Sequence, residues 1–171
     1  DTMGCVVGEK VALALEHAGK RRVPAVAVVT SGGARIQEGA LSLVQMAKTA
    51  VAARRLDDQG LPFISVLANP ATGQAYASFA NLADIILAEP GALVGVSSLR
   101  EMREASEGPL PSGAHTAEAH LEHGMLDATV DRLPILNGLL TELLAVEHLP
   151  ETAFPSPTNA ERQGSRPGML L

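Results

Sequence analysis

The chain has 171 residues, of which 46% are hydrophobic and only 2% aromatic, so a single domain with an aliphatic core is expected. The net charge of −6 argues against a nucleic-acid surface, because phosphate binding needs clustered Lys and Arg. The single cysteine, Cys5, excludes an internal disulfide and a four-cysteine metal site. No apolar stretch approaches the roughly 20 residues of a membrane span and no signal-peptide pattern is found, so a cytoplasmic protein is expected.

Apolar periodicity and turn residues predict an alternation of helices and strands. In chain order, the predicted elements are a helix at 6–17, a strand at 23–29, a helix at 37–56, a strand at 62–67, a helix at 74–82, strands at 84–88 and 92–96, helices at 98–107 and 116–123, a strand at 126–130 and a helix at 134–146. This order favours an α/β fold with parallel strands. The segment from 150 is rich in Pro, Ser, Gly and Arg and is expected to be disordered, which leaves 1–149 as the domain.

Two sequence details allow a closer prediction for the helices. Lys20-Arg21-Arg22 are expected to end the first helix, where cations suit the carbonyl end. The helix at 37–56 carries a stripe with polar breaks that is expected to face the protein: Leu41, Val44, Gln45, Ala47, Lys48 and Val51.

A glycine pair, Gly32-Gly33, lies between the predicted strand at 23–29 and the predicted helix at 37–56. Such a pair lets the backbone turn sharply and leaves its N–H groups without side-chain cover. Bare N–H groups at a helix start can hold an anion, or an oxyanion that forms only during a reaction. The pattern alone fits a simple tight connection equally well.

Further motifs occur in one register between about residues 3 and 132. They are MGCVVGEK at 3–10, SGGARIQE at 31–38, SLVQMAKT at 42–49, GLPFISVL at 60–67, ASFA at 77–80 and AEPGALVG at 88–95. In this register the chain resembles the carboxyltransferase β subunit of bacterial acetyl-CoA carboxylase. The resemblance implies a crotonase-like (ClpP/crotonase) fold, a superhelix of ββα units with helices packed around the sheets.

The resemblance also implies a reaction and its partners. The family moves a carboxyl group from carboxybiotin to acetyl-CoA and forms malonyl-CoA. Biotin would be held by a separate biotin carboxyl carrier protein, an α-type carboxyltransferase subunit would complete the site, and acyl-CoA would be the substrate. No metal in this chain, no nucleic acid and no membrane are expected.

This chemistry needs preorganised hydrogen-bond donors more than a side-chain nucleophile. Negative charge develops on the ureido oxygen of biotin and on the enolate oxygen of the thioester, and one donor is worth roughly 3–4 kcal/mol of barrier. The backbone N–H groups of Gly32, Gly33 and Ala34 are therefore the predicted oxyanion hole. Because the biotin nitrogen can take the proton that acetyl-CoA loses when its enolate forms, no general base is expected in the sequence.

The resemblance gives a second set of candidates, which would contact the acyl-CoA: Arg35, Gly73, Gln74, Tyr76 and Gly95. Arg35 would either tether its loop or meet a CoA phosphate, and loop support is favoured because Glu38 lies close enough to pair with it. Tyr76 would either line the pocket or cap a helix.

The chain departs from the family pattern at three places. Gln74 stands where the family has the second glycine of a pair, so its side chain would narrow the pocket or supply an amide of its own. The family's Gly-Phe-Ala-Gly-Pro-Arg loop reads GVSSLR at 95–100, which loses a glycine and a proline. The N-terminal zinc ribbon and the first strands have no counterpart here, so an N-terminally shortened domain is expected, either a fragment or a chain completed by a partner.

These departures leave two alternatives open: a non-catalytic structural or regulatory relative, and a biotin-independent decarboxylase of a malonyl thioester. Ser31 and Ser78 are conceivable hydrolytic nucleophiles, but no histidine follows at a supporting register. A cluster of three histidines lacks a convincingly placed carboxylate or cysteine, and its members are expected to be exposed and solvated: His115, His120 and His123.

Overall fold

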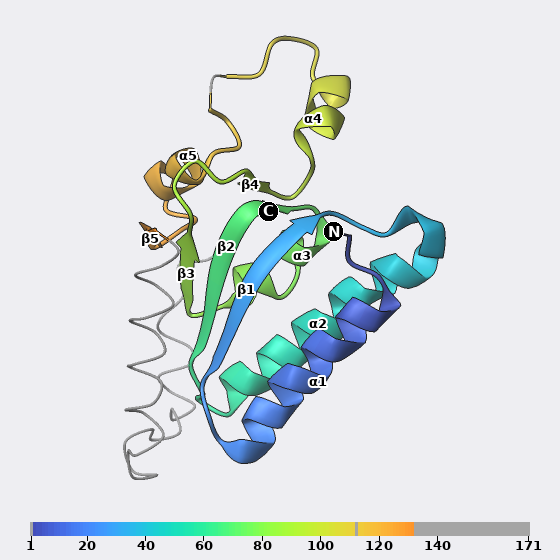
Figure 1. The fold of residues 1–171 in the computed structure, drawn as a ribbon, viewed down its shortest axis with the longest axis vertical. Helices are drawn as coiled ribbons and strands as arrows, with labels where there is room; N and C mark the ends of the chain where they lie inside the picture. The colour runs from blue at the N-terminus through green and yellow to red at the C-terminus, as the bar shows by residue number, and fades with distance from the viewer. Residues whose placement is uncertain (1, 112, 132–171) are drawn as a thin grey trace.

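A computed structural model describes residues 2–111 and 113–131, so the predicted helix at 134–146 and the predicted tail from 150 lie outside the described residues. The described strands form a five-stranded sheet in the order β1-β2-β3-β5, with β4 paired to the far end of β2 (Figure 1). All four strand pairings are parallel, as the alternation of elements predicts. The strands are β1 (Ala25–Gly32), β2 (Phe63–Thr72), β3 (Ile85–Ala88), β4 (Val94–Gly95) and β5 (Ala128–Thr129).

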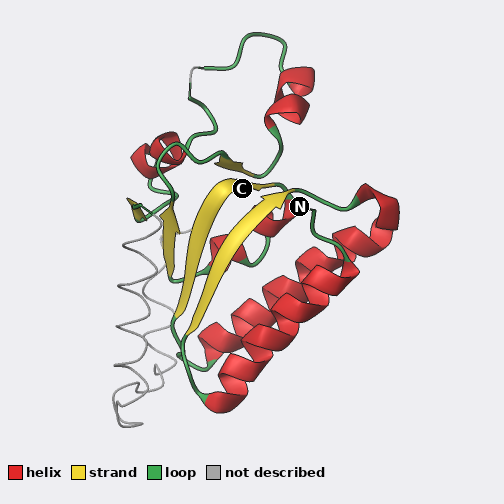
Figure 2. Ribbon diagram, viewed as in Figure 1, coloured by secondary structure: helices red, strands yellow, loops and turns green. Residues whose placement is uncertain are grey.

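Each predicted helix within the described residues is present, but two are interrupted (Figure 2). The predicted helix at 37–56 is a short 3-10 turn followed by α2, because Gly39 at φ +55° breaks the chain direction between them. The predicted helix at 74–82 is wrong as one element, since the helical geometry fails at Ser78. The helices are α1 (Cys5–Arg21), η1 (Ile36–Glu38), α2 (Ala40–Asp58), α3 (Gln74–Ala77), η2 (Ala80–Leu82), α4 (Leu99–Ala105) and α5 (Ala117–Glu122).

Helix α1 ends where the basic residues predict. Arg22 adopts a left-handed conformation, φ 53°, and its N–H bonds back to the carbonyl of Ala18. Lys20 and Arg21 lie in the last turn, where their charges suit the negative end of the helix dipole. No described helix is long and apolar enough to cross a membrane.

Helices α1 and α2 lie side by side along one face of the sheet (Figure 1). They meet through small residues: a Cβ on Gly8 would lie 2.4 Å from Oε1 of Gln45. Of the predicted inward stripe of α2, only Gln45 is buried. The prediction is wrong for the exposed members, Leu41, Val44, Ala47, Lys48 and Val51. The close approach selects the smaller and more polar face instead, whose buried residues are Ser42, Gln45, Thr49, Ala52, Ala53 and Leu56.

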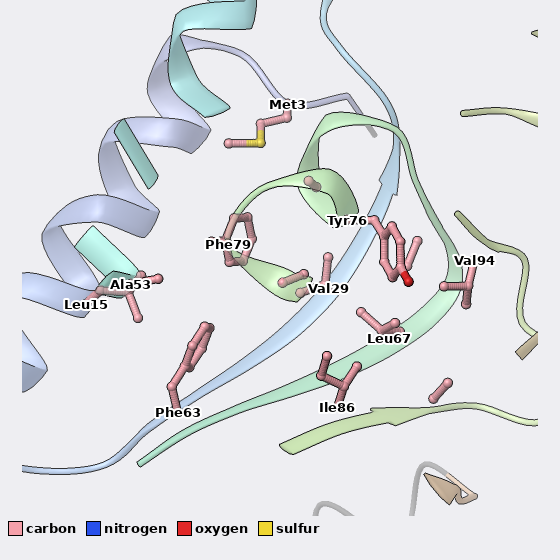
Figure 3. Close-up of a cluster of buried hydrophobic side chains, with 14 of the residues drawn as sticks. Met3, Leu15, Val29, Ala53, Phe63, Leu67, Tyr76, Phe79, Ile86 and Val94 are labelled. Carbon is pink, nitrogen blue, oxygen red and sulfur yellow. The ribbon is translucent and has the colours of Figure 1, made fainter. Parts of the chain in front are cut away.

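The core fills the space between this helix pair and the sheet (Figure 3). Its largest fully buried members include Met3, Leu67 and Tyr76. Burying a side chain such as Leu67 completely stabilises the fold by about 1.5–3 kcal/mol. The core reaches up to the ends of β1 and β2, so the turns that follow these strands rest on packed side chains.

Strands β1 and β2 change their pairing register near their carboxyl ends. Val29 pairs with Leu67, but two residues later Ser31 pairs with Ala71, four residues further along β2. The longer stretch of β2 bulges, and the strands then regain register. Because parallel strands end at the same edge of a sheet, the turns after β1 and β2 lie next to each other.

Candidate active site

The turns after β1 and β2 meet through Gly33 and Gly73. Both have positive φ, +114° and +69°, a conformation that L side chains rarely adopt. A Cβ on Gly73 would lie 2.5 Å from the Cα of Gly33. The two backbones therefore touch directly, and a substrate can approach this edge of the sheet without meeting a side chain from either residue.

Hydrogen bonds fix the direction of the first turn. The Gly33 N–H donates to Oγ of Ser31 at 3.2 Å, and the Gly33 carbonyl accepts from the Met3 N–H at 2.9 Å. The Arg35 N–H donates to the Met3 carbonyl at 2.9 Å. Because N–H groups alternate along an extended backbone, the N–H of Ala34 points away from Met3. It makes no hydrogen bond to any described residue, and Ala34 is half-buried.

The predicted donor groups thus differ in what they can do. The Gly33 N–H is already bonded to a side chain, whereas the Ala34 N–H has no hydrogen-bond partner among the described residues. Gly32, the third residue of the predicted oxyanion hole, ends β1 opposite Thr72.

A third glycine extends the row formed by Gly33 and Gly73. The Gly73 N–H donates to the carbonyl of Gly95 at 2.9 Å. A Cβ on Gly95 would lie 2.7 Å from Nδ1 of His115, so this position also requires glycine. The structure therefore brings three of the predicted site residues, far apart in sequence, into one connected layer.

Gln74 uses its amide within this chain instead of presenting it to a ligand. Its side chain is 5% exposed, and Nε2 donates to the Met3 carbonyl at 2.8 Å. Its Oε1 has no hydrogen-bond partner among the described residues. The amide is thus directed to the backbone of this chain.

Arg35 forms the predicted ion pair, with Nε lying 3.5 Å from Oε1 of Glu38. Glu38 also accepts a hydrogen bond from the backbone N–H of Cys5 at 2.6 Å, at the start of α1. Hydrogen bonds from the thiol and the backbone of Cys5, with a smaller effect of Arg35, hold the pKa of Glu38 below its ordinary value. The carboxylate correspondingly raises the pKa of the Cys5 thiol.

Sequence reasoning misses the role of Glu38 as a link between the loop and α1. The sequence feature that could have indicated this role is Gly4, the N-cap residue of α1, which has no side chain to cap the helix. A Cβ on Gly4 would lie 2.4 Å from Oε1 of Glu38, so glycine leaves room for a carboxylate from another element to take the capping place.

Tyr76 lies in the core, and its side chain is completely buried (Figure 3). Burial raises the pKa of its hydroxyl, which has no hydrogen-bond partner among the described residues. Its ring meets the ring of His120 edge-on, with centroids 5.8 Å apart. Tyr76 packs beneath the turns that carry the other predicted site residues.

The remaining candidate side chains are held by local contacts. The expectation of an exposed His115 is wrong: the residue is 6% exposed because Nδ1 contacts the Val94 carbonyl at 3.2 Å and Nε2 contacts Sδ of Met102.

Ser78 Oγ donates to the Gln74 carbonyl at 2.6 Å, so neither candidate serine has a free hydroxyl poised beside a histidine in the described part of the chain. Within residues 2–111 and 113–131, no group of three or more potential ligands could hold a metal.

Comparison with known families identifies the domain. The profile of the Carboxyl transferase domain matches residues 1–105, the part that contains all the predicted site residues. The chain belongs to this family. It is 50% identical over 145 residues to the acetyl-coenzyme A carboxylase carboxyl transferase subunit beta of Desulforamulus reducens, a match that covers 85% of this chain and 50% of the relative. The chain thus spans about half the length of the curated relatives it matches.

Solved structures confirm the crotonase-like fold of this carboxyl transferase domain. Transcarboxylase 12S with methylmalonyl-coenzyme A and methylmalonic acid bound superimposes with a TM-score of 0.74 at 26% identity, over 84% of this chain and 28% of that one. An enoyl-CoA hydratase from Mycobacterium avium subsp. paratuberculosis superimposes with a TM-score of 0.60 at 18% identity, over 90% of this chain and 69% of that one.

Proposed function

We propose that this chain is a β-type carboxyltransferase subunit, which transfers a carboxyl group from carboxybiotin to acetyl-CoA and forms malonyl-CoA. The observation that supports this most directly is the Ala34 N–H, which has no hydrogen-bond partner among the described residues. The turn that carries it is lined by glycine. The name of the relative that is 50% identical supports the choice of acetyl-CoA as acceptor.

The proposed role of Ala34 follows from the charge that the reaction creates. When the methyl group of acetyl-CoA loses a proton, negative charge moves to the thioester oxygen. A backbone N–H placed about 2.7–3.1 Å from that oxygen stabilises the charge without reorganising, and is worth roughly 3–4 kcal/mol of barrier. The missing side chains at Gly33 and Gly73 leave space for the thioester to reach this donor.

The other predicted contacts have supporting roles in the proposal. The Arg35 side chain is 54% exposed and anchored by Glu38, which suits it to meet a CoA phosphate at the rim of the site. Gly73 and Gly95 provide backbone that a ligand can approach closely, and Tyr76 supports them from the core. Carboxybiotin on a separate carrier supplies the carboxyl group, and an α-type subunit completes the site on its other side.

Reconstitution tests the proposal. The chain is combined with an α-type subunit and a carboxylated biotin carrier, and malonyl-CoA formed from acetyl-CoA is measured with each component omitted in turn. We expect product only when all three are present. Malonyl-CoA formed by the chain and the carrier alone would contradict the role of a second subunit.

The same assay separates the alternatives. Absence of acetyl-CoA binding by calorimetry, with every partner present, would favour a non-catalytic relative. Release of CO₂ from malonyl-CoA without biotin would favour a thioester decarboxylase. A preference for propionyl-CoA over acetyl-CoA in direct competition would keep the reaction but change the acceptor.

A further inference from the structure

The backbone of Met3 contacts both turns of the candidate site. Its N–H donates to the carbonyl of Gly33, and its carbonyl accepts from the N–H of Arg35, both at 2.9 Å. The same carbonyl accepts a second bond, at 2.8 Å, from Nε2 of Gln74 in the turn after β2. One peptide therefore joins the segment around Ala34 to the start of α3.

Met3 is itself firmly placed. Its side chain is 1% exposed and lies in the core beside Phe79 (Figure 3). A buried side chain that fills its space fixes the position of its own backbone, because displacement would open a cavity. The Met3 peptide is thus a stationary point to which both turns are attached.

The chemistry of the Gln74 amide shows what holds it there. A carbonyl only accepts hydrogen bonds, so the group that faces the Met3 oxygen must be the NH₂. This orientation leaves Oε1 buried without a partner among the described residues, which is unfavourable. A methionine would fill the same space without that cost, so the stabilising contribution specific to Gln74 is its bond to Met3.

We infer that Gln74 is a positioning residue, whose amide links the turns after β1 and β2 through the Met3 carbonyl and so keeps the Ala34 N–H directed away from Met3. The Ala34 N–H shares its peptide plane with the Gly33 carbonyl, which accepts from the Met3 N–H, and the Arg35 N–H of the next peptide donates to the Met3 carbonyl. Gln74 binds that carbonyl too, so its link acts on both peptides through the backbone of Met3. Its consequence for rate rests on the proposed function, whereas the link itself does not.

Amide hydrogen exchange in the full 171-residue chain tests the link directly. Gln74→Met removes the donor and keeps the volume of the side chain. We expect exchange of the Arg35 N–H to accelerate at least about tenfold relative to the global exchange of the same variant. Unchanged exchange at Arg35 in a folded Gln74→Met chain would overturn the inference.

Gln45 provides the matched control. It is also buried, its Nε2 donates to the Leu41 carbonyl at 3.0 Å, and its Oε1 likewise lacks a partner among the described residues. Its bond stays within its own helix, so Gln45→Met is expected to leave relative exchange at Arg35 unchanged. Equal acceleration in both variants would show general loosening and would overturn the specific role of Gln74.

Gln74→Glu keeps the test available if the methionine variant does not fold. A protonated carboxyl donates to the Met3 carbonyl, whereas an ionised one cannot. We expect exchange at Arg35 to approach the wild-type rate as the pH falls and to rise as the introduced carboxyl ionises. Exchange that tracks the wild type at every pH would contradict the link.

Activity of the assembled enzyme provides a separate readout. In Gln74→Met we expect kcat to fall about tenfold or more while KM for acetyl-CoA changes less than about threefold, because the donor is misdirected rather than the ligand site removed. An inactive wild-type assembly would contradict the proposed function and leave the exchange result to decide the link. An active assembly with unchanged kcat in Gln74→Met would overturn the positioning role.

Discussion

Gly73 and Gly91 have almost the same positive φ, +69° and +68°, but opposite surroundings. A Cβ on Gly73 would lie 2.5 Å from the Cα of Gly33, whereas a Cβ on Gly91 would meet nothing within 4 Å. The pair therefore separates two reasons for keeping a glycine: the strain of a positive φ, which both share, and backbone contact, which only Gly73 has.

Gly73→Ala is expected to lower turnover of the reconstituted enzyme about 100-fold, because separating the two turns displaces the donor by a large part of an ångström. Gly91→Ala should cost about 1–2 kcal/mol of stability from the positive φ alone and leave turnover near the wild-type rate. Urea unfolding and initial rates measure the two effects. Equal losses of turnover in both variants would show that the contact with Gly33 is unimportant.

The Ala34 N–H can be deleted without changing a side chain by replacing Ala34 with its α-hydroxy analogue, which turns the amide into an ester. We expect turnover to fall by about 10²–10³, since one oxyanion donor is lost. The loss of stability should be small, because the N–H has no partner among the described residues and only the acceptor strength of the Gly33 carbonyl toward the Met3 N–H is weakened. An ester at Arg35, whose N–H donates to Met3, should instead destabilise the fold measurably. Turnover within about threefold of wild type in the Ala34 ester would exclude this donor.

Ser31 is expected to stabilise the first turn through its hydroxyl. Ser31→Ala leaves the buried Gly33 N–H without its partner and should lower the free energy of unfolding by about 1–3 kcal/mol. Ser65→Ala is the matched control, because the hydroxyl of Ser65 is buried in β2 without a partner among the described residues. Its removal should be neutral or stabilising. Equilibrium unfolding measures both variants. Equal losses of unfolding free energy in Ser31→Ala and Ser65→Ala would contradict the role assigned to Ser31.

Glu38 should make the stability of the loop depend on pH in the acid range. Its pKa is lowered in the folded chain, so its stabilising contribution is complete above its unfolded pKa of about 4.3 and is lost as the pH falls through the folded value. The difference in unfolding free energy between wild type and Glu38→Gln should therefore be constant from pH 7 to pH 5 and shrink in stronger acid. Glu122→Gln, at the exposed end of α5, controls for the loss of one surface charge. A difference that grew in acid would contradict the assignment.

The alternation of elements and the edge that carries the site could be predicted from local pattern. Val23 to Val29 is a run of apolar residues bounded by turns, and a strand over most of it, continuing to Gly32, is what the structure has. The glycines at 32 and 95 end strands and those at 33 and 73 directly follow strands, and strand ends of a parallel sheet meet at one edge. Family motifs spread along the chain placed the same residues in one carboxyl transferase domain.

The inward faces of the helices could not be predicted in the same way. Apolar spacing points to Leu41 and Val44 in α2, yet the buried face carries Ser42 and Thr49. The reason is the neighbouring helix: Gly8 allows an approach so close that only the smaller face of α2 fits against α1. Hydrophobicity of a single helix contains no information about that distance.

The amino-acid sequence by itself thus determined the order of the elements, the family and the positions of the glycines, because these depend on local backbone preferences and on spacing. Only the tertiary structure decided which N–H of the turn is free, where the amide of Gln74 goes and which carboxylate caps α1. Each of these is a contact between residues far apart in the chain: Met3 with Gly33, Gln74 with Met3, and Glu38 with Cys5. Such contacts are set by the packing that brings the segments together, which no local pattern encodes.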